Sequence, residues 1–327
     1  MEKRKNYYIY LRIIGLALFI YIIFNINIHE LYLIFKKTNF FYFFLSIILL
    51  PISAFFGGYK WGILVNLKDS KASLKFLIEA HLKGLFLGII TPGRLGEFYR
   101  AKYLSEKTGS SLGRNFYTAL VDRIMDIIIT VAVSLLSIVF FVFSVVDRQF
   151  AIILLGITSI IIFGVVIILF MLFEGGWTKK ILNRMIATTS FKKWGNIFIG
   201  DFFDSVKELS FFVFVRLLIL ALISYFLSVF IYFILALSLG LKITFLQLFF
   251  INALVWIILL FPITFLGLGT RDASYIFFFS ILNIGASSAV AFSMLILFTG
   301  IILSIPGVIL FLSEKTKSDG RRYLSKI

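Results

Sequence analysis

Charged residues that interrupt apolar sequence are the groups best suited to do chemistry in this chain. Arg94, Glu97 and Arg100 follow one another at three-residue spacing, directly after Pro92 and Gly93. A helix that begins after Pro92 would hold these three side chains on one face, near its free amides and positive dipole end. Such a face is suited to phosphate or carboxylate oxygens. The alternative is a charge ladder that ends a helix at the membrane interface, and the spacing favours neither hypothesis.

A second charged group stands where a polar connector becomes an apolar run. Asp122 and Asp126 lie four residues apart with Arg123 between them, so a helix would place both carboxylates on one face. The functional hypothesis pairs them with Arg94 or Arg100 in an empty site, or uses one of them as a proton carrier. The alternative is that they begin a helix, where the dipole favours acidic residues.

A third group contains two glycines, an arginine and an aspartate inside strongly apolar sequence. Gly267 and Gly269 allow positive φ and close backbone approach just before Arg271 and Asp272. A charged pair at membrane depth usually faces a cavity or a partner. A buried site is therefore favoured here over a surface turn just outside the membrane.

The composition indicates what kind of protein positions these groups. Of 327 residues, 61% are hydrophobic and 15% are charged, and the mean hydropathy is +1.04. Soluble domains have roughly 45–50% apolar and about 25% charged residues, so the bilayer must be part of the solvent. The absence of cysteine and the presence of only His29 and His81 exclude thiolate chemistry and histidine-rich metal centres. No cofactor is expected.

The hydropathy pattern predicts an all-α polytopic membrane protein, a single integral domain over residues 1–327. About six full transmembrane helices are expected from long apolar runs at 8–26, 40–57, 126–146, 150–173, 211–239 and 286–312. The first run has no small-residue cleavage site after it, which favours a retained anchor over a signal peptide. The stretches 76–112 and 244–284 are apolar but broken by proline, glycine and charge. They are interpreted as broken or re-entrant helical hairpins.

Basic residues suggest how the chain is oriented. A formal net charge of +16 raises nucleic-acid binding as an option, but basic cytoplasmic loops explain it better. With both termini cytoplasmic, Lys60 and its basic neighbours, the 174–210 loop and the basic tail 313–327 fall inside. The hairpin at 76–112 then enters from the inner leaflet and the one at 244–284 from the outer leaflet. Opposed hairpins are typical of an inverted repeat with a site near the midplane.

Weaker features carry weaker predictions. Glu79 and Lys83 are expected to pair at i,i+4 spacing, and Arg216 is expected to snorkel at the inner end of its span. Gly84 and Gly88 match G-x-x-x-G, which is weak evidence of a helix contact. For the 174–210 loop, a solvated connector is favoured over an amphipathic surface helix.

The charged motifs together resemble a known family. Their order along the chain is similar to that in the flippase-like family, which includes the transmembrane region of lysylphosphatidylglycerol synthases. The motifs that carry the resemblance are Thr91–Arg100, Val121–Asp126, and Pro262 with Gly267–Asp272. The resemblance implies a membrane domain that moves lipids between leaflets. In the best-known members a separate soluble domain performs lysyl transfer. This chain ends about fifteen residues after its last predicted span, so lipid aminoacylation is not expected of it.

The leading hypothesis is a lipid translocase of the cytoplasmic membrane, with an arginine-lined route for an anionic or phosphate-bearing headgroup. Its partners are membrane lipids, either phospholipid or polyprenyl-phosphate-linked, and not nucleic acid; a homo-oligomer is left open. The predicted binding residues are Pro92, Gly93, Arg94, Gly96, Glu97, Arg100, Asp122, Arg123, Asp126, Gly267, Gly269, Arg271 and Asp272.

Two rival hypotheses come from other functional classes. The first is an intramembrane transferase that acts on a polyprenyl-phosphate or phospholipid, with one carboxylate as general base. Enzyme signatures are nearly absent from the sequence, so a transporter is favoured over an enzyme. The second rival is a scaffold whose charges only hold helices together.

Overall fold

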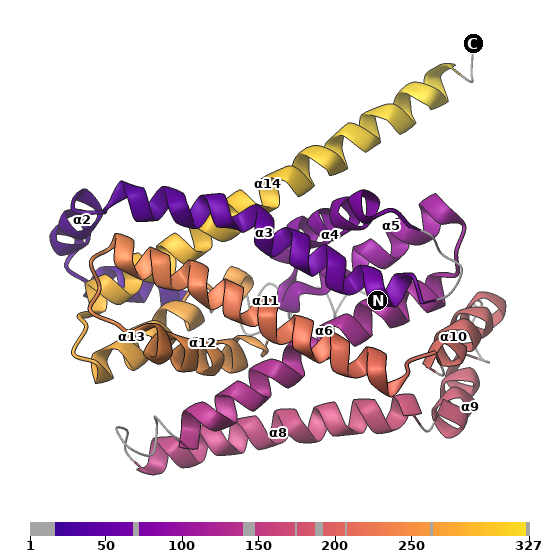
Figure 1. The fold of residues 1–327 in the computed structure, drawn as a ribbon, viewed down its shortest axis with the longest axis horizontal. Helices are drawn as coiled ribbons and strands as arrows, with labels where there is room; N and C mark the ends of the chain where they lie inside the picture. The colour runs from indigo at the N-terminus through magenta and orange to yellow at the C-terminus, as the bar shows by residue number, and fades with distance from the viewer. Residues whose placement is uncertain are drawn as a thin grey trace.

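The computed structural model describes residues 17–67, 72–139, 148–173, 175–186, 192–206, 208–261 and 264–324. Within these ranges the chain forms helices and connecting turns, with no β-strand. The helices form one elongated bundle with two distinct ends (Figure 1). The predicted all-α architecture is confirmed.

Long helices within the described residues run roughly along the axis of this bundle. They are α3 (Phe40–Val65), α6 (Leu112–Ser137), α8 (Arg148–Phe173), α11 (Phe211–Ser238) and α14 (Ala286–Leu324). In the described part of the chain, α3, α11 and Ala286–Ser313 of α14 are long and apolar enough to cross a membrane. These three segments agree with predicted runs.

The predicted number of six full spans is not confirmed. Helix Ala17–Asn25 meets α2 (Ile28–Lys36) at 85°, and this bent pair would be a fourth span if it is counted as one. α6 carries three charged residues near its middle, and α8 contributes a shorter apolar segment over Ile152–Gly164. The start of the run at 8–26 and the end of the run at 126–146 lie outside the described residues.

Two broken hairpins enter the bundle from opposite ends (Figure 1). The first consists of α4 (Leu74–Ile89), the 3₁₀ segment η1 (Pro92–Phe98) and α5 (Tyr99–Thr108). The second consists of α12 (Phe245–Leu259), the 3₁₀ turn η3 (Phe265–Gly267) and α13 (Thr270–Ile281). The two breaks therefore face each other near the middle of the bundle.

Small residues let the first hairpin fold tightly on itself. A Cβ at Gly96 would lie 2.1 Å from the carbonyl oxygen of Leu87 in α4. A Cβ at Gly88 would lie 2.7 Å from the side chain of Glu97, and one at Gly84 would lie 3.0 Å from the Glu97 carbonyl oxygen. The G-x-x-x-G motif is thus the surface of α4 on which η1 packs, as small residues at membrane helix contacts allow.

The second hairpin is held by aromatic packing and a buried hydrogen bond. The Tyr275 ring of α13 meets Phe292 of α14 edge-on, with ring centroids 5.1 Å apart. The Tyr275 hydroxyl donates to Asn252 Oδ1 of α12 at 2.8 Å. These contacts fix α13 between α12 and α14.

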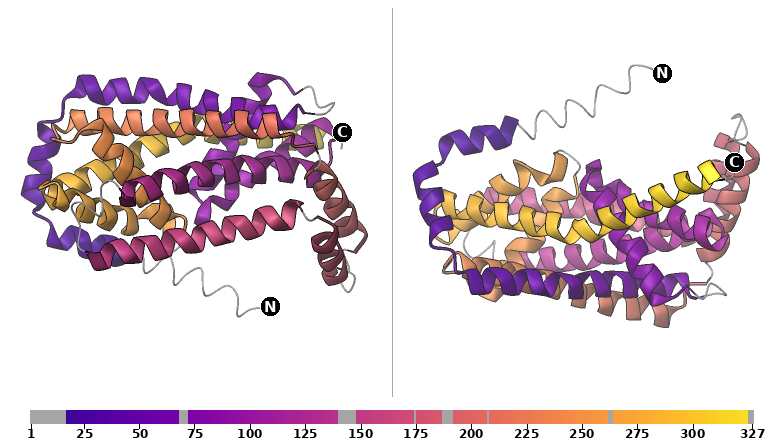
Figure 2. Two further views of the ribbon diagram at one scale, coloured as in Figure 1. Left: turned by 60° about the horizontal axis from the view of Figure 1, so that its bottom comes forward. Right: turned by 90° about the horizontal axis from the view of Figure 1, so that it is seen from above.

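The 174–210 connector differs from the solvated loop that the sequence favoured. It contains α9 (Gly175–Ile186) and α10 (Lys192–Val206), which lie at the end of the bundle opposite α2 (Figure 2). Ile199, Phe202 and Phe203 of α10 are buried in an apolar cluster with residues of α6 and α11. The prediction was wrong because these apolar residues, although they stand among charges, cover the bundle end. At the same end α14 continues as a helix to Leu324, through most of the predicted tail.

Candidate functional site

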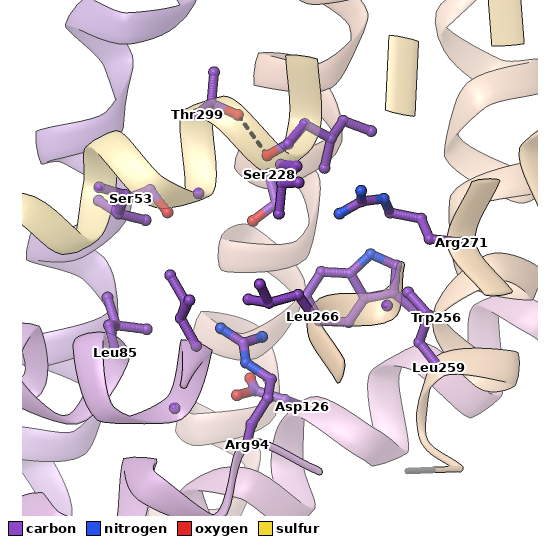
Figure 3. A pocket seen from close by; sticks show the side chains of 18 of the residues that line it. Ser53, Leu85, Arg94, Asp126, Ser228, Trp256, Leu259, Leu266, Arg271 and Thr299 are labelled. Atoms are coloured by element: carbon purple, nitrogen blue, oxygen red, sulfur yellow. Dashed lines mark hydrogen bonds between the residues drawn. The ribbon is translucent and has the colours of Figure 1, made fainter. Parts of the chain in front are cut away.

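A cavity of about 350 Å³ lies where the two breaks meet. Its walls come from both breaks and from α3, α4, α6 and α11 to α14. Figure 3 shows Arg94 of the first break and Arg271 of α13 extending into this space, with Trp256 of α12 between them. Two cations from segments far apart in the sequence therefore share one space.

The first break is a local reversal of backbone handedness. Gly93 has φ 60° and Arg94 has φ 58°, so two consecutive residues are left-handed. The Thr91 hydroxyl closes the break, because it donates to the carbonyl of Leu87 at 2.8 Å and accepts from the amide of Gly96 at 2.7 Å. The left-handed geometry of a non-glycine residue is costly, about 1–3 kcal/mol, and such strain clusters at functional sites.

This geometry corrects the predicted continuous helix after Pro92. Arg94 pairs with Glu97, with 2.7 Å between Nε and Oε1, as i,i+3 spacing allows. Arg100 instead belongs to α5 and its Nη2 lies 2.8 Å from Asp122 Oδ2 of α6. The three charges do not share one helical face, because Gly93 and Arg94 are left-handed and no continuous α-helix runs from Arg94 to Arg100.

Arg100 is enclosed by partners on several sides. Besides Asp122, its guanidinium contacts the carbonyl of Ala119 at 3.3 Å and His81 Nδ1 at 3.3 Å. It also lies over the Trp61 ring, 5.0 Å from the centroid. The pairing of Asp122 with Arg100 that the functional hypothesis expected is present, and it is buried.

Lys60 is the main charged residue that sequence reasoning misplaced. It is 2% exposed, its Nζ lies 3.2 Å from Asp122 Oδ1, and it also contacts Asp126. The sequence assigned it to a basic inner loop, but α3 continues past it to Val65. The apolar residues that follow Lys60 were the signal that could have placed it inside the helix.

The two aspartates lie well inside α6, which begins at Leu112. The helix-start alternative is therefore wrong, and the carboxylates serve buried cations instead. Asp122 has a side chain 4% exposed, whereas that of Asp126 is 37% exposed and lines the cavity. We call the whole group the first-break cluster, made of Lys60, Arg94, Glu97, Arg100, Asp122, Arg123 and Asp126.

A smaller cavity of about 220 Å³ lies on the other side of Arg94. Arg94 and Arg123 line both spaces, together with Leu259 and Leu260 at the end of α12. The Arg94 guanidinium also lies over the Trp256 ring, 5.9 Å from its centroid. Arg94, with its ion-pair partner Glu97, therefore lies between the two cavities, and we call this wall the partition.

The second break has the same left-handed backbone conformation as the first, but different side chains surround it. Leu266 has φ 58° and Gly267 has φ 71°, again a left-handed pair. Gly269, with φ 81°, precedes α13, and its amide donates to Asp272 Oδ2 at 2.8 Å. This cap begins α13 inside the protein. Pro262, part of the resemblance, lies outside the described residues.

Arg271 and Asp272 are buried, 7% and 0% exposed, so the surface-turn alternative is wrong. Arg271 Nε donates to Ser293 Oγ of α14 at 2.7 Å, and the Ser293 hydroxyl donates to Asp272 Oδ1. Ser293 was not predicted, because no feature of its local sequence sets it apart from the other serines of α14.

The structure divides the predicted binding residues into two sets. Those that line the main cavity are Gly93, Arg94, Asp122, Arg123, Asp126, Gly267 and Arg271. Those that stand outside this lining are Gly96, Glu97, Arg100, Gly269 and Asp272. The side chain of Pro92 is not among those that the structure describes. Among the described residues no group of three or more His, Asp or Glu side chains is arranged to hold a metal ion. The charged groups that line the main cavity are the guanidinium groups of Arg94, Arg123 and Arg271, the Lys60 ammonium group, and the carboxylates of Asp122 and Asp126.

The weaker predictions can also be placed. Lys83 is 2% exposed and lies over the Tyr103 ring, 3.7 Å from its centroid. Arg216 donates to the Tyr59 hydroxyl at 2.9 Å in an exposed position. Neither residue lines the main cavity.

Comparison with known proteins identifies the family. The sequence matches the family described as lysylphosphatidylglycerol synthase TM region over residues 12–307. The match covers most of the chain, so the chain belongs to this family, and the predicted resemblance is confirmed. Membership indicates a multi-pass membrane protein with a function related to lipids. No curated protein and no solved structure matches the chain.

Proposed function

We propose that this chain is a lipid translocase that moves an anionic or phosphate-bearing headgroup between the leaflets of the cytoplasmic membrane. The observation that carries the proposal is the cavity between two opposed breaks, lined by Arg94 and Arg271. Irregular backbone and charge at membrane depth are tolerated where they surround a substrate route. Membership of a lipid-related membrane family supports the same conclusion.

The size of the cavity limits what it holds. About 350 Å³ falls in the lower part of the roughly 300–1,000 Å³ range typical of ligand pockets. This volume suits a headgroup and excludes a phospholipid with both acyl chains. Ile301 of α14 lines the cavity and is 43% exposed, so one wall borders the apolar exterior. The acyl chains would stay in the bilayer while the headgroup crosses inside.

The partition at Arg94 supplies a mechanism for passage. A phosphate that enters the main cavity competes with Glu97 for the Arg94 guanidinium, because both offer anionic oxygens. Release of Glu97 would loosen the partition and join the main cavity to the smaller one. Movement of one hairpin against the other would then expose the headgroup to the second leaflet, as in transporters with opposed half-helices.

The distribution of basic residues supports an inward orientation for both termini. The bundle end that carries α9, α10 and the end of α14 holds many lysines and arginines. The end near α2 holds fewer, which are Lys36, Lys37, Arg148 at the start of α8 and Lys242 between α11 and α12. The positive-inside pattern assigns the more basic end to the cytoplasm. The first hairpin would then open inward and the second outward.

Headgroup movement in liposomes tests the proposal. Purified protein is reconstituted with fluorescent phosphatidylglycerol, phosphatidic acid or diacylglycerol, and reagent access reports transfer. We expect phosphate-dependent transfer that slows at least about tenfold in Arg94→Ala and Arg271→Ala, since each loses a charge-assisted contact. Arg216→Gln is the matched control. Folded variants that move lipid as fast as the parent would remove these arginines from the mechanism.

One observation favours the transferase as a second candidate. Asp126 presents a carboxylate to the cavity, which a general base requires. Its contact with Lys60 argues against that role, because the cation stabilises the carboxylate that would accept a proton. Mass analysis of lipids recovered from the same liposomes decides between the two: new lipid products support the transferase and unchanged lipids support the translocase.

A further inference from the structure

Arg271 lines the main cavity, and the hydrogen bonding of its guanidinium group is incomplete. Its Nε donates to Ser293, but Nη2 is buried and has no hydrogen-bond partner among the described residues. The nearest acid, Asp272 Oδ1, is 3.8 Å from Nη2, beyond hydrogen-bond distance, and already accepts from Ser293. A buried donor on a charged group without an acceptor is costly. An acceptor that belongs to a ligand would remove this cost.

Arg94 and Arg100 differ from Arg271 in that each pairs closely with an acid, although Arg100 Nε is also buried without a hydrogen-bond partner among the described residues. Arg94 is held by Glu97, and Arg100 is held by Asp122 and the Ala119 carbonyl. Arg100 also stands outside the lining of the main cavity. An anion that bound Arg100 would have to displace a buried carboxylate, whereas Arg271 offers a donor without displacement.

A polar stripe on α11 runs along the same cavity. Ser224, Ser228 and Tyr232 stand four residues apart on this largely apolar helix, and all three line the cavity. In Figure 3 the Arg271 guanidinium extends toward Ser228. The Ser224 hydroxyl is buried and has no hydrogen-bond partner among the described residues. A second unsatisfied donor therefore lines the space into which Arg271 points.

We propose that Arg271 and the Ser224 hydroxyl form an oxyanion subsite that takes the phosphate group of the ligand. The Ser228 hydroxyl, which donates to the Ser224 carbonyl at 2.9 Å, joins the subsite by turning from that carbonyl to the bound oxyanion. The subsite deepens the proposed function and rests on it for the lipid that carries the phosphate. A guanidinium edge and serine hydroxyls are matched to a tetrahedral oxyanion, which accepts several hydrogen bonds at once. Arg94 then acts at the partition, after the phosphate is bound.

Equilibrium binding separates the subsite from transport. The full chain in uncharged detergent is titrated calorimetrically with dihexanoyl phosphatidic acid, inorganic phosphate or dihexanoyl glycerol. We expect saturable binding of the phosphate-bearing probes and none of dihexanoyl glycerol. Binding of the phosphatidic acid alone identifies a lipid headgroup as the source of the oxyanion. Equal binding of inorganic phosphate identifies a free ion, and both results support the subsite.

Variants make the assignment falsifiable. Arg271→Gln should weaken binding at least about tenfold, and Ser224→Ala about two- to tenfold, as expected for charged and neutral hydrogen bonds. Ser280→Ala, at an exposed position of α13, is the matched control and should bind as the parent does. If Arg271→Gln does not fold, Ser224→Ala and Ser228→Ala carry the test, since neither removes a charge.

The two proposals fail in different ways. Parent-like binding by Arg271→Gln and by both serine variants would overturn the subsite even if liposomes show transfer. Probe binding that depends on Arg271, without lipid transfer by the parent protein, would overturn the translocase and leave the subsite standing.

Discussion

The two breaks have the same backbone conformation but different polar surroundings. Each reverses direction through two consecutive left-handed residues, Gly93–Arg94 in one and Leu266–Gly267 in the other. The first break sits in a cluster of buried ion pairs that joins α3, α5 and α6. The second break is held by a hydrogen bond between two hydroxyls and by a helix cap, and its Arg271, which lines the main cavity, has a guanidinium nitrogen without an acceptor. We infer that the first break is mainly an anchored wall and the second mainly a binding surface.

The helices around the two breaks also occur in the same order in both halves of the chain. A long helix, a broken hairpin and a long helix follow one another in α3 to α6 and again in α11 to α14, with opposite directions in the bundle (Figure 1). Each hairpin packs against a long helix of the other half of the chain: α4 of the first hairpin contacts α14, and α12 of the second contacts α6. We interpret this arrangement as an inverted repeat whose two breaks have diverged in charge.

The largest effect expected from this comparison is on stability at the first break. Asp122→Asn removes the carboxylate shared by Lys60 and Arg100, which leaves Arg100 with a neutral partner and Lys60 with Asp126 as its acidic partner. Loss of one member of a buried ion pair costs about 3–5 kcal/mol. Unfolding of the purified variant in mixed detergent micelles measures the loss. Asp204→Asn, at an exposed pair with Lys179, should change the free energy of unfolding by under about 0.5 kcal/mol.

A smaller loss is expected where the first hairpin packs on itself. Gly96→Ala would bring a methyl group against the Leu87 carbonyl and should cost about 1–3 kcal/mol through overpacking. Gly156→Ala in α8 is the control, because a Cβ there meets nothing within 4 Å. This control should be neutral or stabilising by up to about 1 kcal/mol. Equal unfolding midpoints for the two variants would contradict the close packing of η1 on α4.

At the second break, function should suffer more than stability. Arg271→Gln removes the charged hydrogen bond to Ser293 but leaves Asp272 with its Gly269 and Ser293 partners, so its stability loss should be about 1.5–3 kcal/mol, below that of Asp122→Asn. Lipid transfer and phosphate binding should nevertheless fall at least about tenfold. The unfolding and transfer assays are run on the same preparation. A stability loss equal to that of Asp122→Asn would erase the proposed distinction between the breaks.

The smallest effect is expected outside both breaks. Arg216 donates to the Tyr59 hydroxyl in an exposed position, and neither residue is part of the cavity lining. Arg216→Gln should change the free energy of unfolding by less than about 0.5 kcal/mol. Its transfer rate should match the parent, which checks that the loss of a positive charge alone does not explain the effects at Arg94 and Arg271.

The sequence predicted the parts of the site that local chemistry determines. Proline, glycine and charge inside apolar runs located both breaks, and the apolar flanks of Arg271 predicted its burial. The continuous helix after Pro92 was wrong, because nothing in the local pattern indicates that Arg94 takes a left-handed conformation. Lys60 was misplaced because the apolar run was ended at residue 57, about two helical turns before α3 ends at Val65.

Other parts depend on contacts between distant segments. Ser224 and Ser228 look like ordinary small residues of an apolar helix until α11 is packed beside the second break. Trp256 faces Arg94 only because two hairpins from opposite ends meet. The residue spacing within each hairpin does not indicate which side chains of the two hairpins come into contact. The sequence therefore predicted the two breaks but not the side chains that complete the cavity.

Photo-crosslinking tests most directly whether a headgroup occupies the space between the breaks. A phosphatidic acid analogue with a diazirine on its headgroup is incorporated into liposomes with the parent protein, irradiated, and its adducts are mapped by peptide mass analysis. We predict adducts on α11 around Ser228 and on the segment that contains Arg271, reduced at least about tenfold in Arg271→Gln. Adducts confined to exposed outer positions such as Phe211 and Phe212, and equal in the variant, would contradict the account.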